Sequence, residues 1–103
     1  WLPYVLSRMD EEYEDQFRHL DLSMKPSEYW RRQGYTTFQH EPNVAELIHL
    51  VGVDNVMWGS DYPHPDGVWP DSLAAIEQDL GPLSQEDRYK ITCENAGKLY
   101  GLL

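Results

Sequence analysis

Residues 56–64 read Val56-Met57-Trp58-Gly59-Ser60-Asp61-Tyr62-Pro63-His64. A short apolar run that ends abruptly in small residues predicts a buried strand over Val56 to Gly59. The carboxylate and imidazole that follow then lie at the carboxyl end of that strand, where α/β proteins place their chemistry. Asp61 is therefore positioned like a functional group. Asp is also an ordinary turn-capping residue, and the local sequence leaves both interpretations open.

A second strand is predicted upstream, over the β-branched and aromatic residues Tyr35 to Gln39. Between the two strands, Asn43 is in position to cap a helix that Gly52 ends. The apolar residues of this helix fall at i, i+3, i+4 and i+7, namely Val44, Leu47, Ile48 and Val51. Strand, helix and strand form a βαβ unit, which requires parallel strands covered by the helix.

Helices are also predicted before this unit. Pro3 suits the first turn of an amphipathic helix with apolar positions at Leu2, Leu6, Met9, Tyr13, Phe17 and Leu20. Ser27 is expected to cap a short helix through Tyr29 to Gln33, which Gly34 ends.

Three further helices are predicted after the unit. Pro70 is expected to open a helix that carries Leu73, Ile76 and Leu80. Ser84 and Asp87 resemble a capping box for the next helix. Asn95 to Gly101 then predicts a packed helix with a glycine stop.

Composition excludes several classes of partner. The chain has 103 residues, 41% of them hydrophobic, which is enough for one core. The 18 acidic residues outnumber the 8 basic ones, giving a net charge of -10, so nucleic acid is not an expected partner. The acidic run Asp10 to Asp15 is interpreted as a solvated helix face. No apolar run is long enough to span a membrane, and no signal peptide is visible.

Cys93 is the only cysteine, so no internal disulfide and no thiolate zinc cage can form. We expect it to be buried and inert. This usage fits a reducing compartment, and we expect a cytoplasmic protein.

Two parallel strands cannot cover their own edges. The pattern suits the final third of a barrel of alternating strands and helices, about 250 residues or more in length. We therefore expect a fragment whose aromatic residues remain exposed or line a pocket with an absent portion.

Several side chains could carry chemistry at the expected edge. Asp61 can coordinate a divalent metal or orient a water, but a catalytic zinc takes three protein ligands and an open position. His40 follows the first predicted strand and is a pocket candidate, whereas His19 and His49 are expected on helix surfaces.

The segment after Asp61 adds three more pocket candidates. His64 could bind substrate, move protons or orient Asp61, and flanking prolines stiffen its segment. Tyr62 and Trp69 could wall an aromatic substrate pocket, although core packing is the commoner use of such residues.

Several separated motifs resemble, in order, the carboxyl-terminal part of the amidohydrolase-related (amidohydrolase 2) family. These motifs are Met57 to His64, Trp69-Pro70-Asp71-Ser72, Asn95 to Gly101, and the opening Trp1 to Tyr4 with Arg8 and Asp10. The family includes hydrolases and decarboxylases similar to aminocarboxymuconate semialdehyde decarboxylase.

The resemblance implies a metal-dependent TIM (β/α)8 barrel in which Tyr35 to Gln39 is strand seven and Val56 to Gly59 is strand eight. It also implies that Asp61 binds the metal and handles the proton of the bound water. The family's His-x-His pair and its other two histidines have no counterpart here. Residues 1–103 would then be the carboxyl-terminal fragment of one barrel domain, with one metal ligand of several.

The implied function is hydrolysis, or non-oxidative decarboxylation, of a small carboxylic substrate by a longer chain, and an aromatic substrate is one of the options. The implied cofactor is a divalent metal, zinc before manganese. The expected partner is a small-molecule substrate, with no nucleic acid and no membrane, and a homo-oligomer of the full-length protein stays open. Two alternatives also stay open: a non-catalytic interaction module and an inactive truncated product.

Overall fold

The computed structural model describes residues 1–103 and contains a two-stranded parallel sheet surrounded by helices. Strand β1 (Thr36–Phe38) pairs with β2 (Val56–Trp58) in a register that sets Thr36 opposite Val56 and Phe38 opposite Trp58. The pairing continues one step further, because the Gly59 N–H donates to the Phe38 carbonyl at 2.9 Å. The predicted parallel βαβ unit is therefore present.

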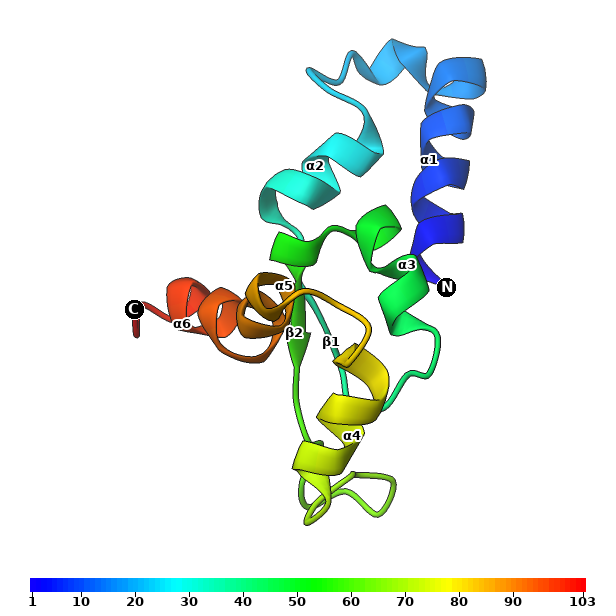
Figure 1. Cartoon of the computed structure of the whole chain (residues 1–103). Coiled ribbons are helices and arrows are strands. Elements are labelled where there is room, and N and C mark those ends of the chain that lie inside the picture. Colours follow the sequence, from blue (N-terminus) through cyan, green and yellow to red (C-terminus); the bar gives the residue numbers. More distant parts are fainter.

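The helices are arranged around the sheet as Figure 1 shows, with α3 on one side of the strands and α6 on the other. Both strands point their carboxyl ends toward the end of the molecule that holds α4. The α-helices are α1 (Leu2–Gln16), α2 (Pro26–Gln33), α3 (Val44–Val51), α4 (Ser72–Leu80), α5 (Gln85–Tyr89) and α6 (Asn95–Leu99). Two 3-10 turns, η1 (Arg18–Leu20) and η2 (Val53–Asn55), and a π-helical segment, η3 (Lys90–Glu94), complete the chain.

The first helix ends earlier than its apolar periodicity predicts. Helix α1 stops at Gln16, because Phe17 leaves the helical region with φ -115° and ψ 15°. Leu2, Leu6 and Tyr13 are buried. Phe17 and Leu20 are exposed, so they do not belong to the buried stripe of α1.

Two predicted caps are placed differently in the structure. Pro26 occupies the first turn of α2 and Lys25 precedes it, with the Glu28 carboxylate accepting from the Lys25 N–H at 2.8 Å. Ser27 is thus not the cap. Its hydroxyl instead donates to Asp10 of α1 at 2.6 Å, which ties the two helices together. Asn43 does precede α3, but its side chain makes no capping hydrogen bond.

The predicted caps of the last helices hold. Ser84 accepts from the Asp87 N–H at 3.1 Å, and Gly101 adopts φ +68° after α6. Helix α4 begins at Ser72 rather than at Pro70, whose peptide bond to Trp69 is cis. Cys93 is exposed, so its expected burial is wrong: Ile91 supplies the core contact of the same segment.

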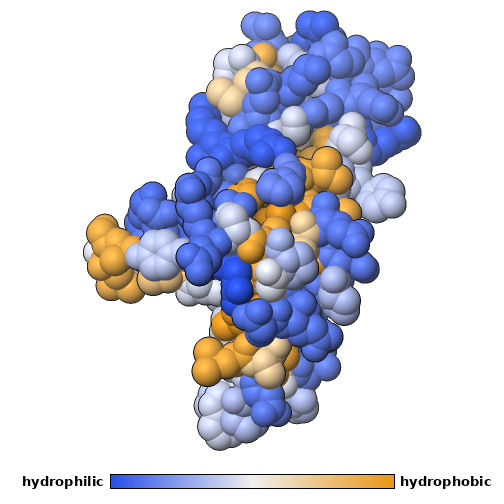
Figure 2. Space-filling view, viewed as in Figure 1, coloured by the Kyte–Doolittle hydropathy of each residue, from blue (hydrophilic) through white to orange (hydrophobic).

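The core is small. It consists of Val44, Ile48, Val56, Leu80 and Ile91, with Phe38 and Trp58 among the partly buried residues against it. Only 14 of 103 residues are buried, and large apolar side chains such as Trp1, Tyr4 and Leu73 remain exposed. Figure 2 shows apolar patches interrupting an otherwise hydrophilic face. None of the helices combines the length and the apolar character that crossing a bilayer requires.

Candidate functional site

The candidate site lies where the two strands end. Because β1 and β2 are parallel, the segments that follow Phe38 and Trp58 emerge at one edge of the sheet. An open hollow of about 410 Å³ lies there, lined by Thr37, Phe38, Gln39, Gly59 and Asp61. The structure therefore places the Asp61 side chain at the edge that both strands share.

Asp61 turns the chain away from β2. Its φ of 57° is in the left-handed region, which Asp tolerates better than most residues. The bond that closes the turn runs from the His64 N–H to the Asp61 carbonyl at 2.8 Å. The carboxylate itself caps no backbone amide, and its side chain is 53% exposed. It stays available for a ligand.

His64 is the one side chain paired with Asp61. Its Nδ1 lies 3.3 Å from Asp61 Oδ2 and also 3.3 Å from the Asp66 backbone N–H. Nδ1 can serve only one of them at a time, because an unprotonated nitrogen accepts from Asp66 and a protonated one donates to Asp61. No arginine or lysine neutralises Asp61, whose carboxylate has only this imidazole beside it.

The loop that carries these groups is held by its own backbone. The Val68 N–H donates to the Ser60 carbonyl at 3.0 Å, and the Gly67 N–H donates to the His64 carbonyl at 2.9 Å. A Cβ at Gly67 would stand 2.8 Å from the Ser60 carbonyl and 3.0 Å from that of Asp61. Glycine at position 67 therefore permits the close approach that shapes the loop.

Tyr62 and Trp69 come together as a pair beside Asp61. Their ring centroids are 5.0 Å apart with planes at 59°, and both side chains are largely exposed. They form an aromatic surface on the loop rather than part of the core. Neither ring lines the hollow beside Asp61.

His40 points elsewhere. Its Nδ1 lies 3.0 Å from Oδ2 of Asp79, a buried residue of α4, and the same oxygen accepts from the Glu41 N–H at 2.7 Å. His40 lies beyond the end of β1, and its contact with Asp79 turns the ring toward α4. His40 does not line the hollow.

Asp79 and Gln39 were missed by sequence reasoning. One feature of the sequence indicates that Asp79 is buried: it falls three residues after Ile76 and next to Leu80, on the apolar face of α4. For Gln39, the sequence offers no indication of a role beyond its place at a strand end. These two residues carry the only buried side-chain polar atoms without a hydrogen-bond partner, Gln39 Oε1 and Asp79 Oδ1.

A metal needs more ligands than this edge supplies. No three His, Cys, Asp or Glu side chains gather anywhere in the chain in a way that could hold an ion. Asp61 has the chemistry of one such ligand, being an exposed carboxylate with no cationic side chain other than an imidazole. The remaining donors would have to come from residues outside this set.

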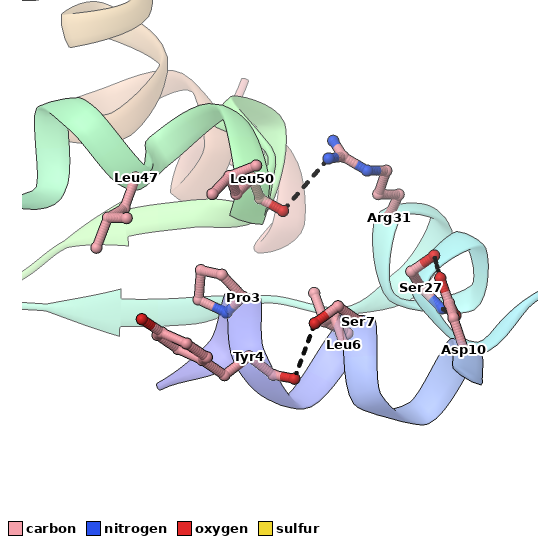
Figure 3. Close-up of a pocket in the computed structure, with 9 residues that line it drawn as sticks. All are labelled: Pro3, Tyr4, Leu6, Ser7, Asp10, Ser27, Arg31, Leu47 and Leu50. Carbon is pink, nitrogen blue, oxygen red and sulfur yellow. Dashed lines mark hydrogen bonds between the residues drawn. The ribbon is translucent and has the colours of Figure 1, made fainter. Parts of the chain in front are cut away.

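A second hollow, of about 470 Å³, lies between α1, α2 and α3, and Figure 3 shows it. Its polar groups are already paired: Asp10 accepts from Ser27, and Arg31 donates to the carbonyls of His49 and Leu50. None of the predicted site residues lines it. It offers no reactive group.

Known proteins place these observations in context. The family model described as amidohydrolase (Amidohydro_2) matches residues 7–102. The crystal structure of an amidohydrolase from Mycobacterium avium subsp. paratuberculosis K-10 is similar over 93% of this chain and 24% of its own, with 27% identity and a TM-score of 0.77. No curated protein matches significantly.

A second similar structure is the 5-carboxyvanillate decarboxylase LigW from Sphingomonas paucimobilis. It matches with 27% identity and a TM-score of 0.75, over 96% of this chain and 30% of its own. The chain thus spans about a quarter to a third of the length of these two solved structures.

Proposed function

Because this chain belongs to the amidohydrolase family, we propose that it supplies one wall and one metal ligand of an enzyme that hydrolyses or decarboxylates a small carboxylic substrate. The observation that carries this proposal is the Asp61 carboxylate, exposed in a hollow at the carboxyl edge of two parallel strands. In this proposal β1 and β2 are strands seven and eight of a (β/α)8 barrel. Residues 1–103 belong to a single barrel domain.

Asp61 is proposed to hold a divalent ion, zinc before manganese, together with ligands from the rest of the barrel. When bound, such an ion supplies Lewis-acid chemistry toward the substrate. The carboxylate can also accept a proton within the hollow. Its exposure and the lack of a competing arginine or lysine support both roles.

His64 is proposed to orient Asp61. Its Nδ1 stands 3.3 Å from Asp61 Oδ2, so a protonated ring donates to that oxygen and favours one orientation of the carboxylate. The proton on Nδ1 can also move within the site, because the imidazole is largely exposed.

The choice between the two reactions depends on the substrate. One similar solved structure is a decarboxylase and another an amidohydrolase, which supports keeping both reactions in the proposal. The exposed pair Tyr62 and Trp69 lies outside the hollow, on the loop that carries Asp61, and supports an aromatic substrate that extends from the hollow onto this loop. Release of carbon dioxide from carboxylated aromatics distinguishes decarboxylation from hydrolysis.

Asp61→Asn in the intact enzyme tests the proposal. We expect turnover to fall by about 10²- to 10⁴-fold and metal content to drop in elemental analysis. Asp71→Asn is the matched control, because Asp71 is exposed near the same loop and its side chain makes no capping bond. Asp61→Asn with wild-type turnover and wild-type metal content would contradict the assignment.

A further inference from the structure

Two hydrogen bonds join the ends of the two strands at the carboxyl edge. The Gly59 N–H donates to the Phe38 carbonyl at 2.9 Å, and no later backbone bond joins the two segments. One residue further along the first segment, the Gln39 carbonyl accepts from the indole N–H of Trp58 at 2.8 Å. A side chain therefore continues the ladder where the backbone pairing stops.

Trp58 reaches Gln39 from behind the hollow. Its ring is partly buried against the core, on the side that the helices cover, and it does not line the hollow. From the front, Gly59 contributes no side chain, and a Cβ built there meets nothing within 4 Å. The space beside Asp61 is therefore open in front, and its two walls are joined at the back.

The other contacts of the segment after β1 do not replace this bond. Gln39 Nε2 lies 3.5 Å from Asp66 Oδ2, at the limit of a hydrogen bond and between exposed groups. The Glu41 N–H donates to Asp79 at 2.7 Å, which ties the segment to α4 rather than to β2. Beyond the last backbone bond, the Trp58 indole is thus the closest link between the segments that follow the two strands.

We infer that Trp58 is a positioning residue, whose indole N–H holds the Gln39 carbonyl and so fixes Asp61 relative to the opposite wall of the hollow. The inference rests on the proposed function and adds a residue that lies outside the hollow and acts through Gln39. A metal ligand is effective only when its supporting residues hold it within about 0.5 Å of the productive position. Loss of a supporting hydrogen bond typically lowers metal affinity by about 10- to 100-fold.

Trp30 offers a matched control at the opposite edge of the sheet. Its indole N–H donates to the Val51 carbonyl at 2.7 Å, and it is partly buried like that of Trp58. Trp30→Phe and Trp58→Phe therefore remove the same kind of bond, from a tryptophan to a backbone carbonyl. Only the second change loosens the edge that carries Asp61.

Hydrogen exchange and chemical shifts of the intact, metal-free enzyme test the inference first. In Trp58→Phe, we expect the Gly59 amide to exchange about tenfold faster, because its bond to Phe38 loses the adjacent support. The backbone resonances of Asp61 should shift. Trp30→Phe should leave both observations unchanged.

A second variant separates the hydrogen bond from the packing of the ring. Benzothienylalanine at position 58 keeps the shape of tryptophan and replaces its N–H with sulfur, which cannot donate. This replacement should reproduce the faster exchange at Gly59. Wild-type exchange in it would assign the effect of Trp58→Phe to lost packing and overturn the inference.

Zinc binding to the intact enzyme, measured by competition with a chelator, gives the functional result. We expect Trp58→Phe and the benzothienylalanine variant to bind Zn²⁺ about tenfold more weakly, and Trp30→Phe to bind it within about twofold of wild type. The visible spectrum of bound Co²⁺, which reports the geometry of the ligands, should change only in the two variants at position 58. Wild-type zinc affinity in those variants, or an equal loss in Trp30→Phe, would overturn the inference.

Failure of the proposed function is seen separately. An Asp61→Asn enzyme that binds Zn²⁺ like wild type removes the metal-ligand assignment. Exchange at Gly59 and the shifts of Asp61 are measured without metal, so they still decide whether Trp58 holds this edge. An enzyme that loses zinc in Asp61→Asn but not in Trp58→Phe retains the proposed function and loses the further inference.

Discussion

The two edges of the small sheet treat buried polar groups in opposite ways. At the amino-terminal edge, the Asn55 amide donates to the carbonyls of Trp30, Arg31 and Gly34 at 2.8 to 3.2 Å. Asn95 donates to the carbonyls of Val53 and Val56, both at 2.8 Å. Every buried side-chain polar atom at this edge has a partner.

The carboxyl-terminal edge contains both orphan atoms, Gln39 Oε1 and Asp79 Oδ1. It also contains the exposed pair of Asp61 and His64. In this sheet the polar side chains of the amino-terminal edge are hydrogen-bonded and stabilise the fold. Polar atoms without a hydrogen-bond partner lie at the carboxyl-terminal edge, where a ligand would bind. This division is expected of parallel α/β sheets. Four changes probe this division.

Asn55→Ala should have the largest effect on stability. The change strips a hydrogen-bond donor from three carbonyls around a buried site, and we expect a loss of about 2–3 kcal/mol in denaturant unfolding. Asn43→Ala is the control, because the Asn43 side chain caps nothing, and it should be nearly silent. Equal losses in the two variants would remove the distinction on which the comparison rests.

Asp79→Ala should cost about 1–2 kcal/mol, since the Glu41 N–H loses its acceptor and His40 its partner. Asp79→Asn keeps an acceptor oxygen and should lose less. Hydrogen exchange at the Glu41 amide should accelerate in the Ala variant. If exchange there is unchanged, the loop after β1 is anchored by something other than Asp79.

Gly67→Ala should cost about 1 kcal/mol, because the exposed loop can yield where a new methyl would meet backbone carbonyls. The larger consequence should be local: chemical shifts from Ser60 to His64 should move while those of Asn55 and Asn95 do not. Gly59→Ala, which meets no atom, is the control. Unchanged chemical shifts from Ser60 to His64 in Gly67→Ala would show that the loop keeps its conformation without glycine at position 67.

Lys90 should give the smallest effect, at the amino-terminal edge. Its ammonium lies 3.3 Å from Asp54, and this contact raises the pKa of Lys90 above its ordinary value. The folded state therefore favours the protonated form: the stabilisation is complete below the ordinary lysine pKa and is lost as the pH rises through the raised value. Lys90→Met should remove this component from the alkaline pH dependence of unfolding, and an unchanged profile would contradict it.

Much of the fold was predictable because it depends on local rules. The apolar run before Gly59 and the helical spacing of Val44 to Val51 predicted a parallel βαβ unit, and β1 and β2 confirm it. The Ser84 cap and the Gly101 stop are confirmed as well. Each follows from a pattern of a few neighbouring residues.

Long-range partners were not predictable in the same way. Ser27 has the chemistry of a helix cap, yet its hydroxyl donates a hydrogen bond to Asp10, 17 residues away. His40 was grouped with Asp61 because it follows a strand, but its ring contacts Asp79 of α4, 39 residues away in the sequence. Cys93 was expected to be buried because free cysteines usually are. That tendency does not indicate which face of η3 the side chain occupies, and Cys93 is exposed.

The space beside Gly59 has a practical consequence for protein engineering. A Cβ at position 59 would have no neighbour within 4 Å, so side chains of graded size can be introduced there without disturbing the strand behind. A series from alanine to valine would act as an adjustable stop, setting how large a guest the edge admits.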